Sequence, residues 1–123
     1  MTALWVAAGA AAGGALRYAV TSHSRRVPTF PGGTLGIAIV NAVGTLLLAV
    51  FTRWHLDGTL PPNGLALLGV GFCGALTTWS SLALDCAEMV LDRRFRASSL
   101  NLAANVAAGG AGGVLGWWLA GLA

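Results

Sequence analysis

The sequence contains no lysine and only four acidic residues, none of them before Asp57. Charged residues make up 9% of the 123 residues, whereas a soluble domain of this size usually carries about 25%. Hydrophobic residues make up 56% of the chain, and its mean hydropathy is +0.75. The shortage of charge argues against a soluble domain and favours an all-α protein of the cell membrane, surrounded by lipid.

Signatures of catalysis are also missing. No nucleophile stands beside a histidine and a carboxylate, and neither a metal-ligand spacing nor a phosphate-loop or dinucleotide motif appears. We therefore expect no enzyme. Cys73 and Cys86 lie on one predicted helix, too far apart to pair, and both are expected to be small buried apolar residues.

Four long runs, the first broken only by Arg17 and the others without charge, predict one domain, 1–123, with four membrane-spanning helices. Each run is about 20 residues or more, the length that crosses a bilayer. The third run is followed by Asp85, Glu88, Asp92 and Arg96 at helical spacing, which predicts that its helix extends to residue 96. The predicted spans are about 3–22, 33–52, 63–84 and 98–122.

Glycines at four-residue spacing let helix backbones approach closely, either within one subunit or between two. Together they predict a tight bundle, and four helices enclose so little interior that we expect an oligomer. The pairs are Gly9 and Gly13, Gly32 and Gly36, Gly109 and Gly113, and Gly112 and Gly116.

All seven basic residues are arginines, and most lie in short predicted loops. We interpret them as topology signals and expect no nucleic-acid partner. Loops one and three share one side of a four-span protein and hold five arginines, against Arg53 alone on the other side. This bias predicts that loops one and three are cytoplasmic. The five are Arg25, Arg26, Arg93, Arg94 and Arg96.

Polar residues inside the spans are the candidates for function, because hydrocarbon offers them no water. The third span has a glycine-flanked polar stretch at its middle, which predicts a broken helix of the kind that forms ion sites. Arg17 either anchors its helix at the interface or draws an anion into a vestibule, and Asn41 either bonds a neighbouring helix or lines a path. The neutral groups suit a dehydrated small ion. The candidates are Arg17, Asn41, Thr78, Ser80, Ser81, Asn101 and Asn105.

Three motifs resemble the CrcB/Fluc family of fluoride channels, and the resemblance covers essentially the whole chain. They are Gly13-Gly14-Ala15-Leu16-Arg17-Tyr18, Val40-Asn41-Ala42-Val43-Gly44 and, most specifically, the segment from Gly71 to Ser81. The resemblance implies an antiparallel dimer that exports fluoride passively through two pathways. It also implies a structural sodium ion, Na+, held by the backbone carbonyls of Gly74 and Thr77.

The family's third span has two phenylalanines, three residues apart, whose ring edges meet the anion, and Trp79 and Leu82 stand at those positions. An indole offers a positive edge or its N–H, whereas leucine offers no ring. Two alternatives to a homodimeric channel stay open. One is a non-conducting or partly conducting subunit paired with a paralogous chain, and the other is a small multidrug exporter. The exporter needs a carboxylate in its first span, and this chain has none there.

Overall fold

The computed structural model describes residues 1–24 and 35–122, which form helices and turns without any strand in these ranges. Three long helices are α1 (Thr2–Ser24), α2 (Leu35–Leu56) and α6 (Phe95–Ala120). The predicted third span is built from α3 (Pro62–Gly64), η1 (Leu65–Cys73), α4 (Gly74–Leu76) and α5 (Trp79–Leu91). The loop arginines Arg25 and Arg26, the glycine Gly32 and the predicted start of the second span at residue 33 lie outside the described residues.

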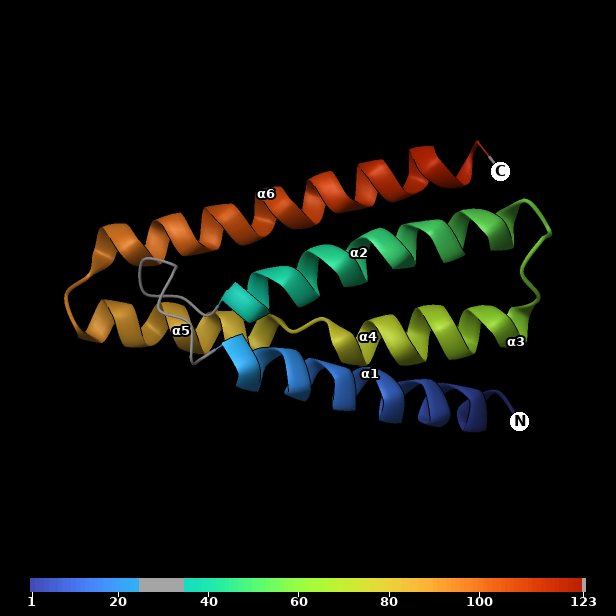
Figure 1. Ribbon diagram of the computed structural model, residues 1–123, viewed down its shortest axis with the longest axis horizontal. Coiled ribbons are helices and arrows are strands. Elements are labelled where there is room, and N and C mark those ends of the chain that lie inside the picture. The colour runs from blue at the N-terminus through green and yellow to red at the C-terminus, as the bar shows by residue number, and fades with distance from the viewer. Residues whose placement is uncertain (25–34, 123) are drawn as a thin grey trace.

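The helices lie lengthwise beside one another (Figure 1). Helix α6 packs along α2, and α1 packs against the η1 and α4 half of the third helix. Both termini and the α2–α3 connection lie at one end, and the α5–α6 connection lies at the other. The α2–α3 and α5–α6 connections, which were predicted to lie on opposite sides of the membrane, thus lie at opposite ends of the bundle.

Three helices in the described residues are long and apolar enough to cross a membrane: Thr2–Ser24, Leu35–Leu56, and Pro62–Leu91 taken through its break. Helix α6 has 26 residues but is not apolar enough to be counted among these three. Its sequence is rich in glycine, alanine and asparagine, which are less hydrophobic than the leucine and valine of α2. The chain is thus a multi-pass membrane protein with a fourth long helix of weaker apolarity.

The third helix is interrupted between α4 and α5, as the polar stretch predicted. Thr77 and Thr78 have extended backbones, with φ/ψ of −75°/153° and −150°/115°. The preceding segment, Leu65–Cys73, is wound as a π-helix, a local geometry that often occurs at functional sites. The interruption lies about halfway along the bundle (Figure 1).

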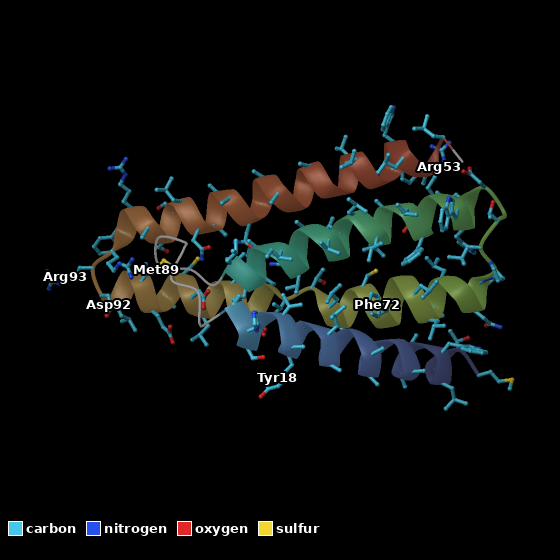
Figure 2. The ribbon with its side chains drawn as sticks, in the orientation of Figure 1. Tyr18, Arg53, Phe72, Met89, Asp92 and Arg93 are labelled. Atoms are coloured by element: carbon cyan, nitrogen blue, oxygen red, sulfur yellow. The ribbon has the colours of Figure 1, made fainter. Side chains whose placement is uncertain are left out.

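The predicted extension of this helix to residue 96 is wrong. Helix α5 ends at Leu91, because Arg93 takes a left-handed conformation with φ 58°. The Arg94 N–H then donates to the Met89 carbonyl and the Arg93 N–H to the Val90 carbonyl, at 2.7 and 3.0 Å, the pattern of a Schellman motif. Asp92 therefore does not share a helix with Arg96, and α6 begins at Phe95 rather than near 98. Arg93 projects beyond this end of the bundle (Figure 2).

Two glycine pairs hold helices at close range, as predicted. A Cβ on Gly9 would overlap the Leu67 carbonyl, and one on Gly13 the Phe72 carbonyl, so α1 touches the backbone of η1. Gly112 and Gly116 bring α6 equally close to the backbone of α2. These pairs pack helices within one chain.

Gly13→Ala should destabilise the protein by about 1–3 kcal/mol, because the added methyl forces two backbones apart. Gly14→Ala is the matched control, since a Cβ there meets nothing within 4 Å. Thermal unfolding of the detergent-solubilised protein measures both. Equal effects of the two substitutions would show that helix propensity, rather than close approach, decides the outcome.

Candidate functional site

The two helix ends at the break are each stabilised by local hydrogen bonds. Before it, the Thr77 N–H and the Thr77 hydroxyl both donate to the Cys73 carbonyl at 3.0 Å, which closes the last turn. After it, Thr78 is the N-cap of α5, and its hydroxyl oxygen accepts from the Ser81 N–H at 3.2 Å, as N-cap threonines do. Two adjacent threonines thus end one helix and begin the next.

Asn41 on α2 satisfies the backbone that the break exposes. Its Oδ1 accepts from the Thr78 N–H at 2.7 Å, and its Nδ2 donates to the Thr78 carbonyl at 3.2 Å. In a continuous helix that N–H would bond the Gly74 carbonyl instead. Gly44, one turn further along α2, makes room for the Thr77 methyl, which a Cβ at 44 would overlap. Asn41 therefore bonds the exposed backbone of the break, and Gly44 provides the space for its Thr77 side chain.

Arg17 also binds the break. Its Nη1 donates to the Thr77 carbonyl at 3.3 Å, across 60 residues of sequence. The guanidinium therefore lies at the helix break and does not simply extend from the helix end. Tyr18, the next residue, points away from the bundle and is exposed (Figure 2).

An open cavity of about 270 Å³ lies against the break. It brings together five of the predicted pathway residues, together with Thr77, Thr45, Leu48 and Gly109. Its lining contains hydroxyls and amides but no charged side chain. The five predicted residues are Asn41, Thr78, Trp79, Leu82 and Asn105.

Trp79 and Leu82 meet this cavity differently. The Trp79 side chain is largely exposed on the outside of the chain, with 69% of its surface accessible, whereas Leu82 is buried at 2%. The indole is therefore available to a neighbouring molecule, and the leucine contributes an apolar wall.

The other candidates surround the cavity without lining it. Ser80 and Ser81 lie beside the Thr78 hydroxyl, which is 3.3 Å from Ser80 Oγ and donates to Ser81 Oγ at 3.0 Å. Asn101 lies behind Asn105 and accepts from its Nδ2 at 3.2 Å. Gly74 is exposed, and a Cβ there would meet nothing within 4 Å.

Sequence reasoning missed part of this network. Cys73 is buried, as expected, but Cys86 is half-buried and has polar partners. Its Sγ accepts from Asn101 Nδ2 at 3.8 Å and donates to the Ser98 carbonyl at 3.7 Å. Leu48 and Gly109 were not predicted as lining residues either, although they continue the helix faces of Asn41 and Asn105 at helical spacing.

Apolar helices that surround a broken helix and a neutral polar cavity define a membrane protein of the channel and transporter class. Residues 4–117 match the model of the family described as "CrcB-like protein, Camphor Resistance (CrcB)". The chain belongs to this CrcB-like family.

Relatives of the chain have names that state an activity. It is 37% identical over 119 residues to "Fluoride-specific ion channel FluC 2" of Rhodococcus jostii, covering 97% of this chain and 98% of the relative. It is 37% identical over 118 residues to "Fluoride-specific ion channel FluC 1" of Thermobifida fusca, covering 94% and 92%. It is 33% identical over 107 residues to "Fluoride-specific ion channel FluC" of Thermococcus kodakarensis, covering 85% and 83%.

Proposed function

We propose that this chain is a subunit of a fluoride channel that lets cytoplasmic fluoride leave the cell passively. The names of its relatives, which cover nearly the whole chain, support this function. They also support a channel over an enzyme.

The observation that carries the proposal is the neutral polar cavity at the helix break. An anion that has lost its water needs donors, and it is repelled by carboxylates. The lining contains hydroxyls, amides and the Trp79 edge. Arg17 does not line the cavity, but its guanidinium donates to the carbonyl of Thr77, which does. Asn41, Thr78 and Asn105 are the proposed polar wall of the path, with Ser80, Ser81 and Asn101 supporting it.

We propose α6 as a fourth span, since it lies beside α2 over most of their lengths (Figure 1). We also propose an antiparallel dimer whose contact surface includes the break. The exposed Gly74 and Trp79 support that surface, because both face away from the rest of the chain. A second subunit would cover the open side of the cavity.

A structural sodium ion is part of the proposal, and the residues present fit it. Neutral carbonyls suit a hard monovalent cation. The Gly74 carbonyl loses its usual helical donor, because the Thr78 N–H bonds Asn41. The Thr77 carbonyl accepts from Arg17 but keeps a second lone pair. Two carbonyls are few ligands for one ion, so a second subunit would have to contribute the same pair.

A heterodimeric channel is the second candidate. The arginine bias favours it, as does the leucine at position 82, since a partner would then supply the aromatic pair. The numbers 1 and 2 in the names of the relatives fit the existence of such pairs.

Liposomes that contain the protein should release fluoride far faster than chloride, and replacement of sodium by a large organic cation should lower the flux. An ion-selective electrode measures both. The assay is run with this chain alone and with a paralogous chain from the same organism. Equal rates for the two anions, or no fluoride release in either pairing, would reject the proposed function.

A further inference from the structure

The three asparagines form one directed chain of hydrogen bonds. Asn41 Nδ2 donates to Asn105 Oδ1 at 3.2 Å, and Asn105 Nδ2 donates to Asn101 Oδ1 at 3.2 Å. Asn101 Nδ2 then donates to Cys86 Sγ at 3.8 Å, and the thiol donates to the Ser98 carbonyl at 3.7 Å. We call this chain, from Asn41 to Ser98, the asparagine ladder. It joins α2, α6 and α5.

The backbone of the break fixes the direction of the ladder. The Thr78 N–H can only donate and the Thr78 carbonyl can only accept, so Asn41 must present Oδ1 to the first and Nδ2 to the second. The remaining N–H of Asn41 then requires an acceptor from Asn105. Asn105 in turn directs its Nδ2 at Asn101. A 180° rotation of the Asn105 amide group would bring its Nδ2 against the Asn41 Nδ2 and its Oδ1 against the Asn101 Oδ1, so that donors would face donors and acceptors would face acceptors.

The ladder leaves the cavity with few donors. An amide nitrogen carries two N–H groups. Those of Asn41 go to Thr78 and Asn105, and Nδ2 of Asn105 bonds the carbonyl and the Oδ1 of Asn101 at 3.1 and 3.2 Å. The hydroxyls of Thr45 and Thr78, which line the same cavity, also donate within the chain, to Asn41 O and Ser81 Oγ.

We infer that Asn105 is a positioning residue that holds one N–H of Asn41 away from the anion. Its Oδ1 competes with a fluoride ion for the same donor, so it sets how tightly the cavity binds fluoride. Asn105 is buried, with 4% of its surface exposed. The buried polar atoms of the Asn41 and Asn105 amides all have hydrogen-bond partners within the chain. This inference rests on the proposed function in one respect, that the cavity binds fluoride.

Removal of the Asn105 amide should therefore release the Asn41 donor. In Asn105→Ala, a water molecule can occupy the vacated space, and fluoride can displace water more readily than a fixed carbonyl. Loss of one competing neutral hydrogen bond corresponds to about fivefold tighter fluoride binding. Ser98→Ala is the matched control, because it removes a buried hydroxyl of the same helix, which donates to the Cys86 carbonyl at 3.1 Å, and leaves every bond of the asparagine ladder in place.

The experiment follows the side-chain ¹⁵N–H₂ resonance of Asn41 during fluoride titration of the full chain in nanodiscs, and fluoride efflux from liposomes. The resonance is assigned by its loss in Asn41→Asp. In Asn105→Ala the half-saturating fluoride concentration should fall about fivefold, while in Ser98→Ala it should stay within about twofold of the unsubstituted protein. Asn105→Ala also leaves the Asn101 Oδ1 without the donor it has in the unsubstituted protein. The double variant, Asn101→Ala with Asn105→Ala, removes that unpaired amide and should bind fluoride as Asn105→Ala does.

Unchanged or weaker fluoride binding in both Asn105→Ala and the double variant would overturn the inference. An equal gain in Ser98→Ala would overturn it too, because loosening of the contact between α5 and α6 would then explain the effect. The proposed function fails separately, if no variant releases fluoride from liposomes. In that case a fluoride response of Asn41 that appears in Asn105→Ala still supports the inference.

Discussion

Asn41→Asp should reduce fluoride flux roughly 100-fold, through the loss of two donors worth about 1.4 kcal/mol each. Aspartate keeps the shape of asparagine and one acceptor for the Thr78 N–H. It replaces Nδ2, which donates to the Thr78 carbonyl and to Asn105 Oδ1, with an oxygen. That oxygen repels both carbonyls, and its negative charge repels the anion.

The pH dependence of this variant gives a second signature. A protonated carboxyl carries one O–H donor. It can therefore bond either the Thr78 carbonyl or Asn105 again, and it no longer carries the charge that repels fluoride. The flux defect should be smaller at acidic pH than at alkaline pH, whereas a misfolded protein would show no such recovery.

Thr45→Val is the matched control for Asn41→Asp. Thr45 lines the same cavity, and its hydroxyl donates to the backbone carbonyl of Asn41 at 2.6 Å. Valine has the same shape without the hydroxyl, so the side chain of Asn41 keeps its bonds. We expect less than about a threefold change in fluoride efflux. A loss in Thr45→Val as large as that in Asn41→Asp would show that cavity polarity in general, and not the amide of Asn41, controls the flux.

The features that could be predicted from the sequence are those that depend on the residues of a single segment. Long runs with little charge predicted spanning helices, and three helices of the described residues are apolar enough to span. Hydroxyls in the middle of an apolar run have no water to bond, and together with the glycines beside them they predicted the break near Thr77 and Thr78. Asn41 was identified for the same reason, since a buried amide requires a partner.

The identities of the partners could not be predicted in this way. The bond between Asn41 and Asn105 exists only because α6 packs along α2, and spacing within one helix does not show which helices pair. Arg17 reaches the Thr77 carbonyl across the bundle for the same reason. The end of α5 was missed because the left-handed residue is Arg93, whereas glycine is the usual signal at that position.

Alone in a cell membrane, this chain should insert in a single orientation, with the α5–α6 connection inside. Arg93, Arg94 and Arg96 are exposed at that end, and Arg53 is the only arginine at the other end among the described residues. Arg53 also has local partners, with an ion pair of 2.8 Å to Asp57 and the Trp117 ring 5.1 Å away. Positive residues in short loops favour the cytoplasm.

Cysteine labelling on intact and permeabilised cells measures the orientation. Leu91→Cys places a thiol at the end of α5, where the leucine is 82% exposed, without changing any charge. It should react with a membrane-impermeant maleimide only after permeabilisation. Thr59→Cys, in the exposed α2–α3 connection, should react in intact cells. The unsubstituted chain reports the background from Cys73 and Cys86.

The result decides between the two proposed dimers. An antiparallel homodimer requires that the same chain insert both ways, which calls for nearly balanced arginines. A fixed orientation means that the antiparallel partner is a second chain with the opposite bias, and fluoride release should then require both chains. Substitution of Arg93, Arg94 and Arg96 by glutamine should weaken the bias and produce labelling of Leu91→Cys from both sides. If Leu91→Cys in the otherwise unsubstituted chain is labelled substantially from both sides, the heterodimer is excluded and a dual-topology homodimer takes its place.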